Sequence, residues 1–255
     1  MEEKLSGILL YGVPYGDNDK IISIFTLEQG LISAKIKGVK KAGAKLKFAA
    51  EPFCFAEYIF SKTANKRTVI GASLIDSFYP VRESVIKLYS ASLAVEFVRK
   101  FFKEGMESKE TFVLLADTLK SLAYSDLSPK CAVARFLIYA LNYSGYALNL
   151  SGCALCNEKI KARTFFNPDT GSFYCEECFD GRGREVDGKT LTALEKIEKW
   201  ENLLDEECVR PLKLLNYYIN YKTDETLSPL KTLLELYLLE VQAFLLRHPS
   251  QVLQP

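Results

Sequence analysis

The sequence is poor in the residues on which most enzyme active sites depend. Its 255 residues include a single histidine, His248, and the acidic residues form no spaced set typical of an acid–base pair or a carboxylate-bound metal. The nucleotide-binding patterns GxGxxG and GxxxxGK(S/T), the nucleophile elbow GxSxG and the zinc-protease pattern HExxH are all absent. These absences argue against an enzyme.

Two further absences bear on the cellular compartment. No apolar run reaches the roughly 18–20 residues that cross a bilayer, so we expect no membrane span. The segment Met1–Lys4 contains two acidic residues where a secretory leader would be basic. The cysteine count is seven, an odd number, and three of them stand in apolar surroundings typical of small core residues in a reducing compartment: Cys54, Cys131 and Cys208. We therefore expect a cytoplasmic protein.

Net charge is also low, at +1, which argues against indiscriminate binding of nucleic acid. Its distribution, however, is uneven. Residues 1–80 carry eleven Lys and Arg against eight Asp and Glu, whereas the remainder carries twenty-two against twenty-four. Residues 29–50 contain no acid and six lysines, namely Lys35, Lys37, Lys40, Lys41, Lys45 and Lys47.

The strongest motif is a pair of CxxC knuckles, Cys153 with Cys156 and Cys175 with Cys178, separated by eighteen residues. At this spacing four thiolates can surround one tetrahedral Zn²⁺. Residues 165–174 predict a hairpin that returns the second knuckle to the first. Four sulfur ligands leave no position for water or substrate, so we expect one structural zinc ion. The alternatives are two disulfides or four unrelated buried thiols; a deaminase site is excluded because the HxE and PCxxC segments are absent.

Five short segments before residue 80 have the composition of strands. They span residues 5–13, 20–27, 31–39, 51–60 and 68–78. No helix between them is long enough for a parallel crossover, so the segments predict an antiparallel sheet that closes on itself. We favour a five-stranded barrel of the OB type, with an SH3-like barrel as the alternative.

In an OB-fold, the third strand and its neighbouring loops lie where single strands bind. The six lysines would then form a groove that follows phosphates, joined by Lys62, Lys66 and Arg67 from the next turn. The alternative is that the lysines only protect a sheet edge, but six cations without an acid exceed what that needs. Tyr15 and Phe48 are candidates for base stacking, with a core or hinge position as the alternative.

Residues beyond 80 predict helices on both sides of the knuckles. The helical segments span residues 81–103, 109–123, 129–145, 187–200, 211–221 and 229–246. The last segment is apolar on nearly all sides, so it must lie at the centre of a bundle or be covered by a partner. The prediction is an α+β multidomain protein: an OB-fold at 1–80, a helical domain at 81–150 and 188–248, and a zinc-binding insertion at 151–187. The tail after His248 carries no structural signal.

Several motifs, taken in order, resemble those of the bacterial RecO family of recombination and repair mediators. They are Tyr15-Gly16-Asp17-Asn18-Asp19-Lys20-Ile21 with Leu27-Glu28-Gln29-Gly30; Gly38 with Lys40 and Lys41; Glu51-Pro52-Phe53; Asn142-Tyr143-Ser144-Gly145-Tyr146; and Phe166, Pro168, Gly171, Cys175 and Cys178. Asp17 stands where the family more often has Glu, and the stretch from Leu245 departs from the family pattern.

The resemblance implies binding of single- and double-stranded DNA, strand annealing, and loading of RecA onto DNA coated by single-strand binding protein. It also implies contacts with RecR, with RecF in many bacteria, and with the acidic, apolar C-terminal tail of the coating protein. None of this needs ATP or a catalytic residue, and it implies a cytoplasmic, nucleoid-associated protein. Two other classes stay open: an RNA-binding OB and zinc protein of translation or transcription, and an adaptor that binds no nucleic acid.

Overall fold

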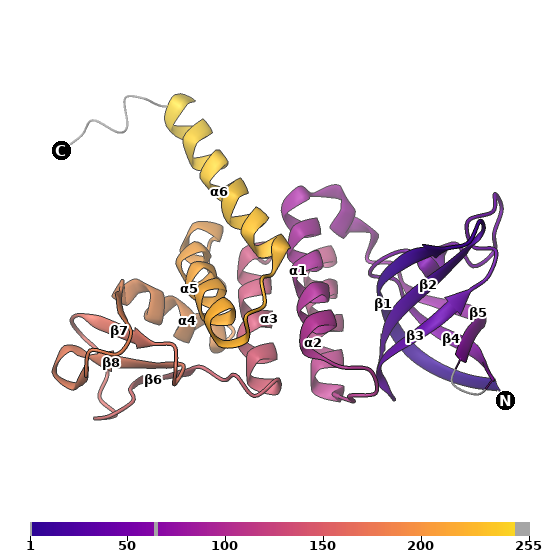
Figure 1. Ribbon diagram of the computed structural model, residues 1–255. Coiled ribbons are helices and arrows are strands. Elements are labelled where there is room, and N and C mark those ends of the chain that lie inside the picture. Colours follow the sequence, from indigo (N-terminus) through magenta and orange to yellow (C-terminus); the bar gives the residue numbers. More distant parts are fainter. Residues whose placement is uncertain (1, 64–65, 248–255) are drawn as a thin grey trace.

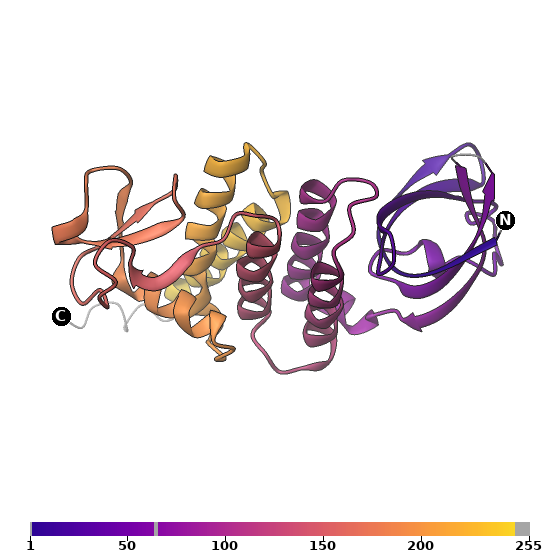
Figure 2. The ribbon, with the colours of Figure 1, turned by 90° about the horizontal axis from the view of Figure 1, so that it is seen from below.

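The computed structural model describes residues 2–63 and 66–247, with side chains described as far as residue 239. The chain forms an elongated molecule with a barrel at one end, helices in the middle and a small sheet at the other end (Figures 1 and 2). Within the described part of the chain, no helix is both long and apolar enough to cross a membrane. His248 and the tail that follows it lie outside the described residues.

The amino-terminal part is a closed five-stranded barrel, seen almost along its axis in Figure 2. Its strands follow one another around the barrel in the order β1, β2, β3, β5 and β4. The wall closes where β1 pairs antiparallel with β4, and where β3 meets β5 in parallel at Lys35 opposite Thr68. This arrangement confirms the predicted OB-type barrel. The strands are β1 (Glu2–Tyr15), β2 (Asp19–Thr26), β3 (Gly30–Ile36), β4 (Phe55–Thr63) and β5 (Lys66–Asp76), with a short 3-10 helix η1 (Phe48–Ala50) before β4.

Alternation along β3 sorts its side chains as the sequence predicts. Ile32, Ala34 and Ile36 are buried in the barrel interior, whereas Ser33 and Lys37 are exposed on the outside. This follows from the period of two in a strand, in which successive side chains point to opposite faces. The strand therefore carries its lysines on the wall that faces solvent.

Another part of the barrel wall packs on the helices. Ile8, Leu10 and Phe25 belong to the same apolar cluster as the helical core. The ring centroid of Phe25 lies 5.6 Å from that of Phe102 and 6.2 Å from that of Phe112. Barrel and helices thus share one continuous core.

Most helices begin at side-chain caps. Ser84, Ser108 and Ser128 each accept a hydrogen bond from a backbone amide of the first turn, which satisfies one otherwise unpaired donor. The first helix therefore begins at Val85 and not at Val81 as predicted, because a 3-10 turn precedes Ser84. The helical elements are η2 (Tyr79–Glu83), α1 (Val85–Phe101), α2 (Lys109–Tyr124), α3 (Pro129–Tyr143), α4 (Gly188–Glu198), α5 (Asp205–Thr223) and α6 (Ser228–Arg247).

The predicted start of α5 at Pro211 is wrong. The helix begins at Asp205 and contains Pro211 in its second turn. Three acids occupy the first turn, where they face the positive end of the helix dipole, and the carboxylate of Glu207 accepts a hydrogen bond from the backbone amide of Leu204. These capping contacts start the helix upstream of the proline, which then lies inside it.

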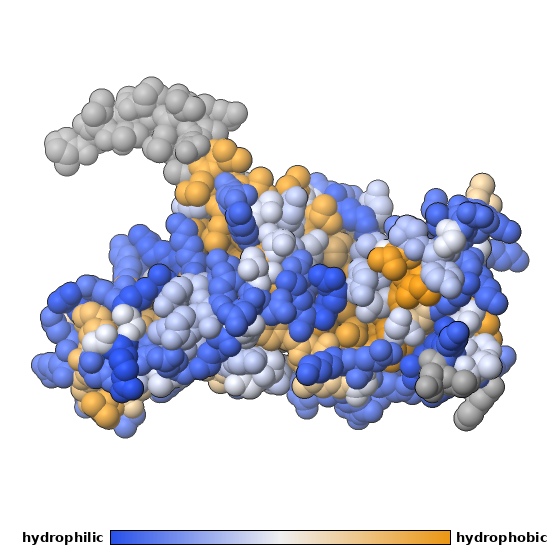
Figure 3. All heavy atoms as spheres, in the orientation of Figure 1, coloured by the Kyte–Doolittle hydropathy of each residue, from blue (hydrophilic) through white to orange (hydrophobic). Residues whose placement is uncertain are grey.

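Helix α6 does not lie at the centre of a bundle. Its first turns bury Leu230 and Leu233, but the side chains of Leu238 and Leu239 are 50% and 60% exposed. The helix projects away from the other helices, and Figure 3 shows apolar residues on its surface (Figures 1 and 3). Of the two sequence-based expectations for this segment, burial in a bundle is wrong for the described residues beyond Leu233.

The knuckle region forms a small sheet that packs on α5. Its strands follow the order β6, β8, β7 and β9, and β7 and β8 form the predicted hairpin. The ring of Phe166 meets that of Tyr218 edge-on at 5.6 Å. Gly171 turns the hairpin at φ +64°, and a Cβ there would lie 2.8 Å from the Tyr218 hydroxyl. The elements are β6 (Asn149–Cys153), β7 (Thr164–Asn167), β8 (Ser172–Cys175), a short 3-10 helix η3 (Glu176–Cys178) and β9 (Arg184–Val186).

Candidate metal centre and nucleic-acid interface

The structure brings all four knuckle cysteines together. Their sulfur atoms lie within 4.8 Å of one another, with Cys153 buried at the end of β6 and Cys156 exposed in the following turn. Four sulfurs bound to one Zn²⁺ at about 2.3 Å would be about 3.8 Å apart in a regular tetrahedron. The cluster has the size and the donor set that one tetrahedral ion requires.

Hydrogen bonds from backbone amides favour the thiolate form of Cys153, which is the form that binds a metal. Burial alone would raise the pKa of Cys153, but hydrogen bonds from the amides of Cys156, Cys175 and Leu155 outweigh it and lower the pKa to about 6. The neighbouring sulfur of Cys175, together with burial, raises the pKa of Cys178 to about 12. The close spacing of the sulfurs therefore disfavours a second negatively charged thiolate. A bound divalent cation offsets this repulsion.

The lysine-rich loop, residues 37–48, is fixed against the turn between β1 and β2. The carboxylate of Asp19 accepts hydrogen bonds from the Gly38 amide at 2.8 Å and from the Lys35 ammonium at 2.7 Å. The Lys40 amide donates to the carbonyl of Asn18 at 3.0 Å. The hydrogen bonds from Lys35 and from the Gly38 amide hold the pKa of Asp19 below its usual range. The loop is thus held in place although its lysine side chains are in water.

The loop lysines differ from Lys35 in their surroundings. The exposed lysines of the loop are Lys37, Lys40, Lys41, Lys45 and Lys47. Within the described part of the chain, none of these five forms an ion pair, whereas half-buried Lys35 is paired with Asp19. The five form a cationic surface that we call the lysine loop.

Lys62, Lys66 and Arg67 lie at the other end of β3. Because β5 runs parallel to β3, with Thr68 opposite Lys35, the turn between β4 and β5 lies beside the start of β3 and away from the lysine loop. Continued back from Thr68, this register puts Lys66 level with Ser33, four positions before Lys37, and Lys62 pairs with Arg67. The cations named from the sequence therefore form two groups and not one groove.

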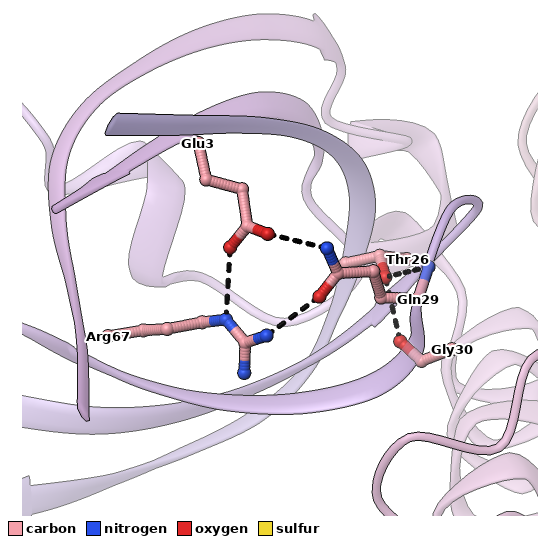
Figure 4. A network of polar contacts seen from close by, with 5 residues as sticks. All are labelled: Glu3, Thr26, Gln29, Gly30 and Arg67. Atoms are coloured by element: carbon pink, nitrogen blue, oxygen red, sulfur yellow. Dashed lines mark hydrogen bonds and ion pairs between the residues drawn. The ribbon is translucent and has the colours of Figure 1, made fainter. Parts of the chain in front are cut away.

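Arg67 is held in a network at this second end (Figure 4). Its guanidinium donates to the Glu3 carboxylate at 3.2 Å and to the Gln29 side-chain oxygen at 2.7 Å, and the Gln29 amide donates to Glu3 at 2.5 Å. The network joins β1, β5 and the turn between β2 and β3, where the Thr26 hydroxyl also donates to the Gly30 carbonyl. Lys62 and Lys66 are exposed beside it.

The two aromatic candidates for base stacking, Tyr15 and Phe48, differ in their exposure. Phe48 packs against the barrel core, whereas Tyr15 is 54% exposed at the end of β1. Sequence reasoning missed Tyr11 and Val13, which are exposed on the same strand at 39% and 47%. Alternation along β1 would have grouped these three residues, but it could not tell which face of the strand stays uncovered.

Together these features define a class of protein in which an OB-type barrel with a cationic loop shares a core with helices that carry a four-cysteine cluster. The family model "Recombination protein O N terminal" matches residues 1–78, and "Recombination protein O C terminal" matches residues 82–231. The chain belongs to the RecO family of DNA repair proteins.

Curated relatives agree with this assignment. A DNA repair protein RecO of Dehalococcoides mccartyi is 32% identical over 69% of this chain and 69% of that relative. Those of Acetivibrio thermocellus and Alkaliphilus metalliredigens are 29% and 25% identical, over 69% and 88% of this chain and 70% and 90% of their own lengths. All three names denote a DNA repair protein.

Proposed function

We propose that this chain is a DNA-binding recombination mediator that anneals complementary single strands and helps to load RecA onto DNA coated by single-strand binding protein. Membership of the RecO family supports the process. The residues that support the proposal are those of the lysine loop, whose five exposed lysines form no ion pair within the described chain, on a barrel of the OB type.

Phosphate neutralisation is the central physical step. Each strand of DNA is a polyanion, and lysines that contact phosphates release condensed counterions and reduce the repulsion between two strands. The bases need to stay free to pair, so a cationic surface that contacts only the backbone suffices for annealing. No nucleotide hydrolysis and no catalytic residue are needed for this step.

The two cation groups divide the contacts. The lysine loop binds one stretch of backbone, and the exposed Lys62 and Lys66 of the β4–β5 hairpin contact the strand again, back along β3. Lys35 and Arg67 contribute less to phosphate binding, because Asp19 and Glu3 already neutralise them. Their main effect is to hold the loop and the barrel in place.

One structural zinc ion would be held by Cys153, Cys156, Cys175 and Cys178. The four sulfurs fill a tetrahedron and leave no position for a reacting molecule, so the ion stabilises the fold and takes no part in chemistry. The small sheet packs on α5 through Phe166, and the ion thereby stabilises this end of the helical part.

In this proposal residues 1–80 bind DNA, residues 81–150 and 188–248 bind protein partners, and residues 151–187 hold zinc. The partners are RecR, in many bacteria RecF, RecA on the DNA, and the acidic, apolar C-terminal tail of the coating protein. The exposed leucines of α6, Leu238 and Leu239, offer an apolar surface for that tail. The protein acts in the cytoplasm, at the nucleoid.

The test is the annealing of complementary oligonucleotides, first bare and then coated with single-strand binding protein. Charge reversal of the lysine loop at Lys40, Lys41 and Lys45 to Glu should abolish annealing of both kinds of substrate. The matched control reverses three exposed lysines on or next to α4 and α5: Lys189, Lys199 and Lys213. The control should anneal bare strands at the wild-type rate. Equal rates for wild type and the loop variant would contradict the proposal.

A further inference from the structure

One face of the barrel carries aromatic and apolar side chains that stay partly exposed. Tyr11, Val13 and Tyr15 alternate along β1 and are 39%, 47% and 54% exposed. The register places Val13 opposite Ile21 of β2, and Ile21 opposite Lys35 of β3. Residues directly opposite one another share a face of the sheet, so an apolar row on β1 leads across the sheet to a cation on β3. Figure 3 shows an apolar area over β1 and β2.

This face is hollowed beside Tyr11. A shallow cavity of about 150 Å³ is lined by apolar side chains of β1, β2 and β3, with Tyr11, Ser23, Ser33 and Glu104 as its polar members. Its volume equals that of about five water molecules in the liquid. Apolar walls with hydroxyl groups at the margin suit a flat, partly polar ring better than they suit an ion.

A cation lies over each tyrosine. The Lys35 ammonium is 4.5 Å from the centroid of the Tyr15 ring, and the Arg99 guanidinium is 5.1 Å from that of Tyr11. A cation covers only one face of a ring, and both rings remain substantially exposed. The site thus combines exposed π surfaces for stacking with cations that each hold one ring in place.

We propose that Tyr11, Val13 and Tyr15, which we call the aromatic face, bind unstacked bases of single-stranded DNA. The inference rests on the proposed function and adds a second kind of contact to it, because the lysine loop reads only backbone charge whereas the aromatic face requires bases. It selects single strands over duplexes, since bases stacked within a duplex do not present their faces.

The charges around the face orient the strand. Lys37 of the lysine loop directly follows β3, so the sugar–phosphate backbone passes the carboxyl-terminal end of that strand. Glu104 lines the hollow and bridges Leu31 at the start of β3, where it repels phosphate. The bases therefore point from the end of β3 towards the side chains of β1.

The experiment compares two labelled oligonucleotides of equal length, an oligothymidylate and its abasic counterpart, in equilibrium binding by fluorescence anisotropy. Wild type should bind the oligothymidylate more tightly. Tyr11→Ala and Tyr15→Ala should each weaken binding of the oligothymidylate by about 5- to 140-fold, which is the equivalent of the roughly 1–3 kcal/mol of one base stacked on an aromatic ring. Neither substitution should change binding of the abasic strand.

Two controls separate stacking from folding. Phe at either position keeps the ring and should restore the preference for bases. Tyr79→Ala removes a tyrosine that is 63% exposed but lies on η2, outside the aromatic face, and should bind both oligonucleotides as wild type does.

The outcomes also distinguish this inference from the proposed function. Equal affinity of wild type for the two oligonucleotides, or unchanged binding by both alanine variants, overturns the aromatic face alone. Failure of wild type to bind either oligonucleotide at low salt overturns the proposed function and the inference with it.

Discussion

The lysine loop makes a quantitative prediction for the salt dependence of DNA binding. Its five exposed lysines, if each neutralises one phosphate of a single strand, contribute about −3.5 to the slope of log K against log salt. Replacing Lys40, Lys41 and Lys45 by Ala should make the slope shallower by about 2.1. Between 50 mM and 200 mM salt, the affinity of the variant should then fall about 18-fold less than that of wild type.

The assay is a titration of a labelled oligothymidylate at several salt concentrations. Alanine at Lys189, Lys199 and Lys213 provides the control, because these lysines are also exposed but lie on or next to α4 and α5. The control should keep the slope of wild type, although the net charge of the whole chain changes by the same amount. Thermal unfolding of all three proteins checks that the loop substitutions leave the barrel folded.

Two results would refute this reasoning. An unchanged slope in the loop variant would mean that the lysines do not contact phosphate. An equal reduction in the loop variant and in the control would mean that only the total charge matters, and then the position of the loop on the barrel would have no significance for binding.

Four further predictions concern single positions. Cys178→Ser should lose bound zinc and lower the free energy of unfolding by several kcal/mol, measured by metal content and urea titration; a metal-free variant as stable as wild type would contradict the zinc site. Gly171→Ala and Gly181→Ala should both lose about 1–2 kcal/mol from a positive φ, but only Gly171→Ala also overlaps a neighbour, so equal urea midpoints would contradict the close packing. Arg67→Ala should lower barrel stability by about 1–2 kcal/mol and leave the salt slope of DNA binding unchanged; a reduced slope would show a phosphate contact. The pKa of Asp19 is lower in the folded state than its unfolded-state value near 3.8, so the ionised carboxylate stabilises the fold above that pH. This contribution is lost as pH falls through the folded-state pKa. Wild type and Asp19→Asn should therefore differ in Tm at neutral pH and converge in acid.

Local signals in the sequence predicted local structure well. The spacing of the four cysteines and the turn residues between them are contained within 26 residues, and the structure brings the four sulfurs together. Alternation along β3 separated buried Ile32 and Ala34 from exposed Ser33 in the same way. In both cases the information lies within a few residues of the feature, so a sequence pattern captures it.

Features that depend on distant partners could not be predicted. The parallel contact of β3 with β5 joins residues about 33 positions apart and places Lys62 and Lys66 away from the lysine loop. The exposure of Tyr11 depends on which wall of the barrel the helices cover, and strand alternation carries no information on that. Pro211 predicts a helix start because proline favours the first helical position, but the acids of the preceding turn begin the helix at Asp205.

The shared core between barrel and helices limits how the molecule can move. With Ile8, Leu10 and Phe25 packed among helical side chains, the barrel cannot swivel about the connection that follows it. A DNA strand bound to the barrel therefore has a fixed orientation and distance relative to a protein partner bound to the helices. A fragment that ends at residue 80 would expose these apolar side chains to water. It should therefore aggregate under conditions in which the full-length chain remains monodisperse.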